Sequence, residues 1–162
     1  MGAGESFEVE ANISVKKVNT VFDERGPELV TNGGFDDAGD LAEWGHSNTS
    51  GTSTFTVSDG EATFTRDTFG DAFYQTDVAP AVAGVYLLSF DITALSGGNL
   101  RYSFSQNSAR NTANEKTVTT TGSYSTAFVS DGTLLDFVFD LSANGASVTL
   151  SLIHISEPTR PY

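Results

Sequence analysis

The stretch that decides the fold is Thr54-Phe-Thr-Val-Ser-Asp-Gly-Glu-Ala-Thr-Phe-Thr65. Apolar residues alternate with polar ones on both sides of the turn sequence Ser58-Asp59-Gly60. Residues two apart in a β-strand point to the same face, so each half of the stretch has one apolar and one polar face. An Asp-Gly pair between two alternating runs is a strong short-range signal for a β-hairpin. The stretch therefore predicts an antiparallel hairpin that packs one face on a core.

The same period of two recurs along most of the chain. Five further runs alternate apolar with polar residues: Phe7–Val15, Tyr86–Ile92, Leu100–Phe104, Leu135–Leu141 and Val148–Leu152. Turn sequences rich in Gly, Asn, Asp and Pro separate these runs, and no helical period of useful length interrupts them. The polar stretch 106–122 predicts a long loop that leads into a strand near Thr117–Thr121. Regularly spaced short strands of this kind are typical of a β-sandwich or barrel.

Composition excludes several classes of partner. The chain has 162 residues, which suffices for one domain with a real core. Its net charge is −13, and it lacks the basic stripe that nucleic acids or an anionic membrane surface would need. It contains no cysteine, which excludes disulfides and thiolate metal sites. No apolar run approaches the roughly 20 residues of a membrane span. We therefore expect no nucleic-acid partner and no membrane insertion.

The segment Glu28-Leu-Val-Thr-Asn-Gly-Gly-Phe-Asp36, followed by Trp44, is the most specific stretch of the chain. It resembles the opening of jelly-roll carbohydrate-binding modules of bacterial xylanases and cellulases, and similar openings occur in phage tail-fibre and bacterial surface proteins. Phe73–Val78 and Gly84–Thr93 also fit this family. The resemblance implies an all-β jelly-roll sandwich, galactose-binding-like, over residues 28–149. It also implies a polysaccharide or cell-surface glycan as the partner.

Two further resemblances suggest how the chain is divided. Ala11-Asn-Ile-Ser-Val-Lys-Lys-Val18 resembles the closing strand of such modules, so residues 1–27 are interpreted as the remnant of a preceding module plus a linker, within a tandem array. Residues 150–160 resemble a translated sequencing adapter, so residues 150–162 are interpreted as a non-native tail. The sandwich would then lack its native last strand, and the strand Phe7–Val18 would swing round to fill the vacant place. The alternative is that Val148, Leu150 and Leu152 belong to a genuine last strand.

Sugar binding by a sandwich needs exposed rings on which pyranose faces stack, with polar groups around them. The candidate ligand-binding residues are Trp44, Tyr74, Gln75, Asp91, Arg101 and Tyr124. Each has a structural alternative. Trp44 and Tyr74 are equally compatible with core positions, and Arg101 with a plain surface ion pair to Asp91.

The resemblance also implies a structural calcium ion between the opening strand and the closing strand. The candidate ligands are Asp36, Glu28 and the backbone oxygens near Asn32. Carboxylate and carbonyl oxygens are the donors that Ca²⁺ prefers. The alternative is a solvated acidic loop.

Enzymatic function finds no support in the sequence. His46 and His154 are the only histidines, which leaves no plausible Ser–His–Asp set or histidine-rich metal site. No pair of carboxylates is marked by a motif for glycoside hydrolysis. We therefore expect a non-catalytic carbohydrate-binding or host-surface-recognition module of a phage tail or bacterial surface protein, located outside the cell or on a virion. The alternative is a ligand-free structural spacer domain.

Overall fold

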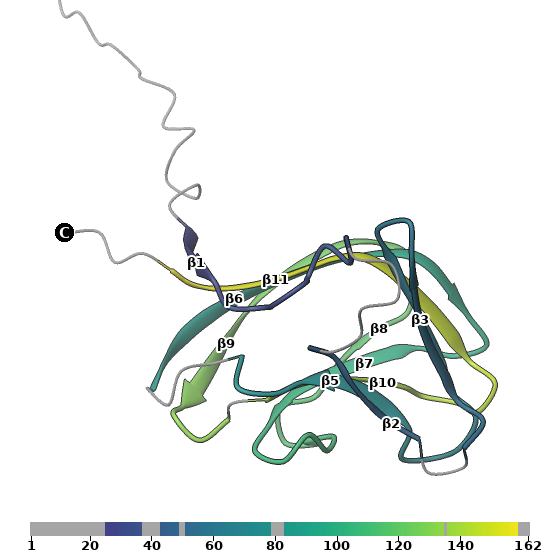
Figure 1. The fold of residues 1–162 in the computed structure, drawn as a ribbon. Coiled ribbons are helices and arrows are strands. Elements are labelled where there is room, and N and C mark those ends of the chain that lie inside the picture. The colour runs from purple at the N-terminus through teal and green to yellow at the C-terminus, as the bar shows by residue number, and fades with distance from the viewer. Residues whose placement is uncertain (1–24, 37–42, 49–50, 79–82, 135, 159–162) are drawn as a thin grey trace, which may run out of the picture.

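The computed structural model describes residues 25–36, 43–48, 51–78, 83–134 and 136–158. Within these ranges the regular structure consists of strands alone, arranged as two antiparallel sheets that face each other (Figure 1). This confirms the prediction of an all-β sandwich. The same ranges contain no helix long and apolar enough to cross a membrane.

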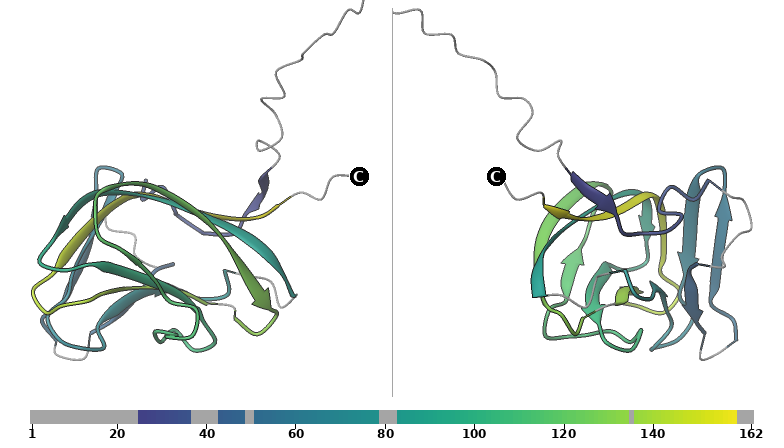
Figure 2. Two further views of the ribbon diagram at one scale, coloured as in Figure 1. Left: turned by 180° about the vertical axis from the view of Figure 1, so that it is seen from behind. Right: turned by 60° about the vertical axis from the view of Figure 1, so that its left-hand side comes forward.

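The larger sheet has six strands, in the order β3-β4-β11-β6-β9, with β1 paired to β11 beside this path. Its members are β1 (Arg25–Glu28), β3 (Thr54–Ser58), β4 (Glu61–Thr65), β6 (Ala83–Ser96), β9 (Gly122–Asp131) and β11 (Ser147–Pro158). The smaller sheet has five strands, in the order β2-β5-β10-β7-β8. Its members are β2 (Gly45–Ser47), β5 (Ala72–Gln75), β7 (Leu100–Ser105), β8 (Lys116–Val118) and β10 (Asp136–Leu141). Figure 2 shows the two layers from behind and from one side.

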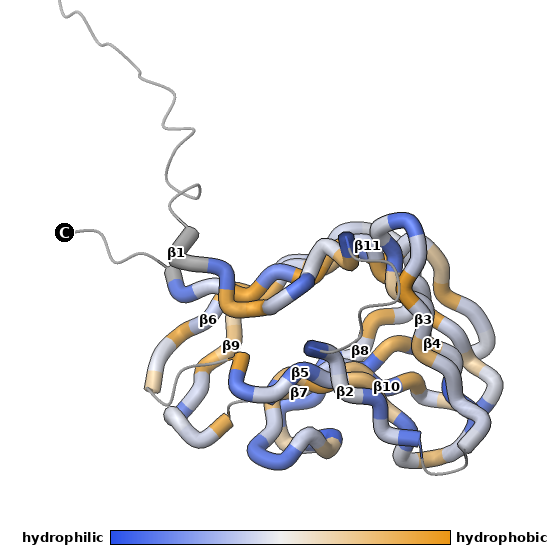
Figure 3. The backbone as a smooth tube through the Cα atoms, in the orientation of Figure 1, coloured by the Kyte–Doolittle hydropathy of each residue, from blue (hydrophilic) through white to orange (hydrophobic). Residues whose placement is uncertain are grey.

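The predicted hairpin is confirmed as β3 and β4. Ser58 pairs with Glu61, so the turn consists of Asp59 and Gly60 alone, with φ angles of 54° and 77°. Positive φ at both central residues is the requirement of a type I′ turn, which Asp-Gly meets. Phe55 and the other apolar residues of the hairpin are buried, and Figure 3 shows the resulting alternation of hydropathy along the strands.

Aromatic rings from both sheets fill the core. Phe73 of β5 stacks on Phe139 of β10 and on Phe55 of β3, with centroid distances of 4.9 Å in both pairs. Phe90 of β6 meets Phe139 edge-on at 5.3 Å. Such ring pairs stabilise a core beyond the burial of their area, by about 0.5–1.5 kcal/mol each. The core therefore joins the two sheets through phenylalanines that the strand alternation directs inward.

Strand β11 departs from the predicted alternation. Its register shifts on both sides of Leu150, which is the signature of a β-bulge. After the bulge Ile153 and Ile155 point into the core, whereas Leu152 is 40% exposed. The predicted alternation of Val148–Leu152 is therefore wrong at Leu152, because one extra residue in a bulge exchanges the two faces of a strand.

Strand β11 also bears on the predicted division of the chain. It lies between β4 and β6, inside the six-stranded sheet, so the place of the expected vacant strand is filled. The predicted boundary between residues 149 and 150 falls within it, and the alternative of a genuine last strand matches the geometry. The adapter origin of residues 150–162 stays a prediction, since strand geometry does not test it. The predicted strand Phe7–Val18 lies outside the described residues.

Candidate ligand-binding cleft

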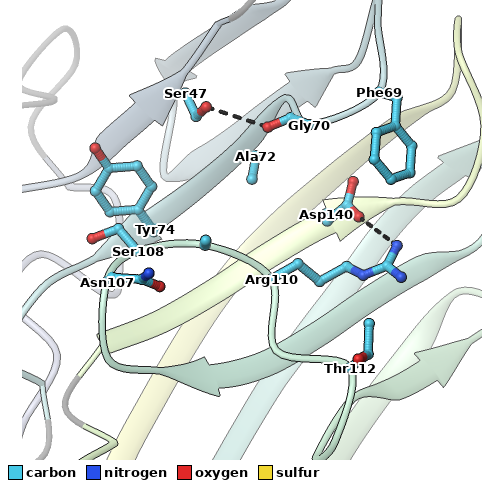
Figure 4. Close-up of a pocket in the computed structure, with 11 residues that line it drawn as sticks. Ser47, Phe69, Gly70, Ala72, Tyr74, Asn107, Ser108, Arg110, Thr112 and Asp140 are labelled. Atoms are coloured by element: carbon cyan, nitrogen blue, oxygen red, sulfur yellow. Dashed lines mark hydrogen bonds and ion pairs between the residues drawn. The ribbon is translucent and has the colours of Figure 1, made fainter.

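A cleft of about 500 Å³ lies on the outer face of the five-stranded sheet. This is within the size range of small-molecule sites. Strands β2, β5 and β10 form its floor, and the segments 66–71 and 106–115 form its walls. Figure 4 shows the side chains that define it, with Phe69 and Tyr74 at opposite ends and Arg110 and Asp140 between them.

Amide side chains hold the wall 106–115 against the sheet. Asn114 Oδ1 accepts a hydrogen bond from Phe104 N at 3.1 Å, and Asn114 Nδ2 donates to Phe104 O at 3.0 Å. Asn114 thus takes the place of a neighbouring strand just before β8 begins. Ser108 donates its N–H and its hydroxyl to Asp136 Oδ2 at 2.7 and 2.9 Å. Because these partners are buried, the wall has a fixed position over the sheet.

Three guanidinium groups surround the Asp140 carboxylate on the floor of the cleft. Arg66 Nη1 lies 3.0 Å from Asp140 Oδ1, Arg101 forms an ion pair with Oδ2, and Arg110 Nη1 lies 3.6 Å from Oδ2. Arg66 also donates Nε–H to Thr68 O at 2.8 Å. Burial raises the pKa of Asp140 above its ordinary value, while Arg101, Arg66 and Arg110 favour its ionised form. The cluster ties β10 and β7 to the loop that follows β4.

Two aromatic rings border the cleft. Phe69 is 76% exposed and lies near Arg66 and Arg110, with ring-centroid distances of 5.2 Å to Arg66 Cζ and 6.0 Å to Arg110 Cζ. At the other end the half-buried Tyr74 ring lies over Gly45, where an added Cβ would sit 2.8 Å from Tyr74 Oη. Glycine at position 45 therefore makes room for the ring. An aromatic side chain that stays mostly exposed beside a cleft is the kind of surface on which a ligand ring stacks.

Of the predicted ligand residues, Tyr74 lines the cleft and Trp44 does not. Trp44 is 3% exposed, packs on Phe35, and donates Nε1–H to Asn32 O at 3.3 Å. Trp44 is therefore a core residue, as the alternative predicted, and presents no exposed ring to a ligand. Gln75 is likewise 5% exposed and exchanges two hydrogen bonds with the Thr31 backbone, at 2.9 and 2.7 Å. Both the oxygen and the nitrogen of its amide are therefore engaged with the protein backbone.

The remaining three predicted ligand residues are distributed over both sheets. Asp91 is in β6 and Arg101 in β7, which belong to different sheets, so the alternative of an ion pair between them is wrong. Arg101 instead supports the cleft from below, through Asp140. Tyr124 stacks on Phe90 at 5.4 Å in the six-stranded sheet, and its Oη donates to Thr120 O at 2.7 Å. Neither Asp91 nor Tyr124 lines the cleft.

Two of the predicted calcium ligands, Glu28 and Asn32, have hydrogen-bond partners within the protein, and the calcium ion itself stays a prediction. Glu28 Oε1 accepts hydrogen bonds from the backbone N–H groups of Leu29, Val30 and Ile155 at 2.9–3.0 Å, and Oε2 pairs with His154 Nδ1. Backbone donors and an imidazole thus occupy the carboxylate that an ion would need. Asn32 Oδ1 accepts from the Asp36 N–H at 3.2 Å. Within the described ranges, no three His, Asp or Glu side chains gather closely enough to hold a metal ion.

The sequence did not single out Phe69, Asn107, Arg110 or Asp140 as members of one site. Phe69 has the clearest signal in retrospect, since it precedes Gly70 in a turn outside every alternating run. In the sequence, Asp140 is an ordinary polar residue of an alternating run. Only the structure shows that arginines from three separate segments surround its carboxylate. Convergence of this kind depends on the pairing of strands and cannot be read from spacing.

The two facing sheets have the fold of a jelly-roll sandwich, and solved structures share this fold. A structure described as "CBM4 structure and function" matches with a TM-score of 0.57 and 19% identity, over 79% of this chain and 99% of the other. The module "BiXyn10A CBM1" matches with a TM-score of 0.59 and 13% identity, over 82% and 98%.

The CBM22-1 xylan-binding domain of Paenibacillus barcinonensis Xyn10C matches with a TM-score of 0.54 and 14% identity, over 85% of this chain and 98% of the domain. No protein-family model matches the sequence, and no curated protein sequence matches it. At these identities the likeness establishes the fold, and it confirms the predicted resemblance to jelly-roll carbohydrate-binding modules.

Proposed function

We propose that the cleft on the five-stranded sheet binds a polysaccharide or a cell-surface glycan, and that the protein is a non-catalytic recognition module. The observation that carries this proposal is Phe69, a large apolar ring held 76% exposed at the rim of a fixed cleft. Exposing an apolar ring to water is unfavourable for folding. A ligand that stacks on the ring would remove it from water, which explains why the ring is kept at the surface. Sugar rings present the apolar face that such a side chain stacks against.

The rest of the lining supplies the polar contacts that a sugar needs. Ser47, Asn107 and Thr112 border the cleft with hydroxyl and amide groups, which can pair with sugar hydroxyls. Tyr74 offers a second ring with a hydroxyl at its tip. A few polar groups among apolar walls is the usual composition of a small-ligand site. The fold it shares with carbohydrate-binding modules supports the same conclusion.

The electrostatics of the cleft favour binding over catalysis. Glycoside hydrolysis needs two carboxyl groups that flank the scissile bond, one of them free to donate a proton. Among the described residues that line the cleft, Asp140 is the one carboxylate, and three arginines engage it. Asp136, the first residue of β10, is buried and accepts hydrogen bonds from Ser108 and from the Asp77 N–H. We therefore propose no catalytic role for either aspartate.

We further propose that the module works outside the cell, on a bacterial surface protein or a phage tail. The support is the resemblance of the segment Glu28–Asp36 to modules of such proteins. A single shallow cleft of this kind binds weakly, and neighbouring copies in a tandem array would raise the avidity.

The test is binding to an array of plant, algal and bacterial polysaccharides, followed by affinity electrophoresis with variants. We expect Phe69→Ala and Tyr74→Ala each to weaken binding about tenfold, which corresponds to about 1.4 kcal/mol for a lost stacking contact. The matched control is Val129→Ala, because Val129 is also 74% exposed but lies away from this cleft. Binding that survives both ring substitutions, or no binding to any glycan, would favour a ligand-free spacer domain instead.

A further inference from the structure

We propose that the free edge of strand β9 is an interface at which a second copy of this chain pairs, strand to strand, to form a twofold dimer. The inference is independent of the proposed sugar binding, because no residue of β9 lines the cleft. It starts from a difference in length among the strands at the edges of the two sheets.

Strand β9 is a long edge strand. It pairs with β6 alone (Figure 1), through ten consecutive residue pairs without a register shift, and within the described ranges no strand lies on its other side. The segment 113–116 faces it across a hollow of about 290 Å³ and does not pair with it. The edge strands β3, β2 and β8 have five, three and three residues. Of these four strands, β9 alone offers a row of backbone donors and acceptors long enough for a full additional strand.

The edge of β9 lacks the features by which proteins prevent edge-to-edge association. Such features are charged side chains, proline, a β-bulge or a very short strand. No charged residue and no proline occurs from Thr117 to Ser130, although the chain contains 21 Asp and Glu residues. Two copies of a chain with a net charge of −13 repel each other, and this repulsion is smallest where the surface is uncharged. The edge of β9 is therefore a surface at which a second copy can approach.

Apolar side chains lie exposed beside this edge. Val129 of β9 is 74% exposed and pairs directly with Val85 of β6, which is 46% exposed. The next pair on the same outer face is Ala127 with Leu87, of which Ala127 is exposed. Two of the four large hydrophobic residues that are exposed in the described ranges thus lie at this edge. A strand added to β9 would cover part of this patch and remove it from water.

The faces of β9 restrict how two copies can pair. Residues directly opposite in an antiparallel pair point to the same side of the sheet, so an outward residue must face an outward residue. A twofold axis at Ala127 meets this condition, because it places Ala127 opposite its own copy and Val129 opposite Ser125, all of which point outward. Each copy then presents the same neutral, apolar edge to the other, as a twofold interface requires.

The same register keeps the acidic residues apart. Each Asp131 lies opposite Ser123 of the other copy, four residues from the axis, so the two Asp131 residues are roughly 27 Å apart along the strands. Asp91, which pairs with Ser123 inside each copy, is two strand spacings or roughly 10 Å from Asp131 of the other copy. Both distances exceed the Debye length of about 8 Å at physiological salt, so the repulsion is largely screened.

The experiment measures the mass of the full chain by sedimentation velocity, from micromolar to millimolar concentration at physiological salt. We expect the mass to rise from that of one chain to that of two. Hydrogen exchange of the β9 amides should slow over the same range of concentration, because the added strand accepts and donates hydrogen bonds along this edge. Exchange of the amides in β3, the other edge strand of the sheet, should not change.

Charged substitutions at the proposed axis supply a sharper test. Ala127→Lys and Ala127→Glu each place two like charges opposite each other, so each variant should weaken association by about a hundredfold or more. An equimolar mixture of the two variants should recover association, because opposite charges then face each other. The matched control is Thr56→Lys, which adds the same charge at an exposed position of β3 and should leave association unchanged.

The outcomes decide between the possible occupants of the edge. A protein that stays a single chain at every concentration would overturn the inference. So would a dimer that tolerates both charged variants, or a mixture that fails to recover association, because either result would place the interface elsewhere. Amides of β9 that are protected in a single chain, and that lose this protection when residues 1–24 are removed, would assign the edge to that segment instead. Recovery in the mixture would also show that both variants are folded.

Discussion

Arg66 and Asp140 form an ion pair of 3.0 Å in which the two side chains are 2% and 7% exposed. The pair joins the end of the β3–β4 hairpin to β10, and therefore links the two sheets. Asp140 also faces Arg101 and Arg110, so one carboxylate organises the base of the proposed binding cleft. The stability of the fold and the proposed ligand binding thus depend on the same carboxylate.

Breaking this pair should destabilise the protein strongly. Arg66→Met leaves a buried carboxylate with fewer partners and removes the Arg66 hydrogen bond to Thr68 O. Loss of one partner of a buried pair costs about 3–5 kcal/mol. We expect the free energy of unfolding, from urea titration, to fall by that amount. Lys116→Met, at an exposed cation, should change it by no more than about 0.5 kcal/mol. A cost below about 1 kcal/mol for Arg66→Met would contradict a structural role for the pair.

Substitutions in β11 test whether this strand belongs to the core. Ile155 is 0% exposed and Leu152 is 40% exposed, although both lie in the region that resembles an adapter. We expect Ile155→Ala to lower the free energy of unfolding by about 2–5 kcal/mol, as for other buried aliphatic truncations. Leu152→Ala serves as the matched control and should cost about 0.5 kcal/mol or less, since its side chain is largely in water. Equal effects would mean that the bulge, and with it the register of β11, is wrongly placed.

Calcium should not stabilise the protein through Glu28. A site with a dissociation constant near 10 μM would raise stability by about 2.7 kcal/mol at 1 mM ligand. We expect no such increase, because the Glu28 carboxylate is taken by three backbone N–H groups and His154. Melting temperatures in 1 mM CaCl₂ and in EDTA provide the measurement. A calcium-dependent rise that disappears in Glu28→Gln would restore the ion that the family resemblance implies.

The stability of the protein should fall as pH is lowered past 6.5, in part through His46. Burial lowers the pKa of His46, although Asp71 raises it in opposition, and Nε2 lies 2.9 Å from Ser53 Oγ. Between the lowered folded pKa and the unfolded value of about 6.5, the unfolded chain binds more protons. Protonation therefore favours unfolding in that window, and the contribution is constant above it.

The measurement is the difference in unfolding free energy between the protein and His46→Gln, from pH 7.5 to 5.5. We expect the advantage of the native histidine to shrink as pH falls. His154 is present in both proteins, so its titration cancels from the comparison. A difference that is independent of pH, or that grows on acidification, would show that His46 is not the group that burial perturbs.

The sequence by itself determined the all-β class, the hairpin at Asp59-Gly60 and most core positions. It could do so because strand faces follow a period of two and because few residues other than Asn, Asp and Gly tolerate positive φ in a tight turn. The resemblance of Glu28–Asp36 added the jelly-roll type, which the solved structures confirm.

Only the tertiary structure decided which side chains meet. Trp44 and Gln75, which were predicted to bind ligand, are buried in the interior. Asp91 and Arg101, which were expected to lie near each other, belong to different sheets. The bulge in β11 reversed its faces, and the loop after β7 covered the outer face of the smaller sheet. These outcomes depend on long-range pairing and on local register shifts, which leave no periodic trace in the sequence. The cleft, with Phe69, Arg110 and Asp140, exists because three distant segments are brought together over one sheet.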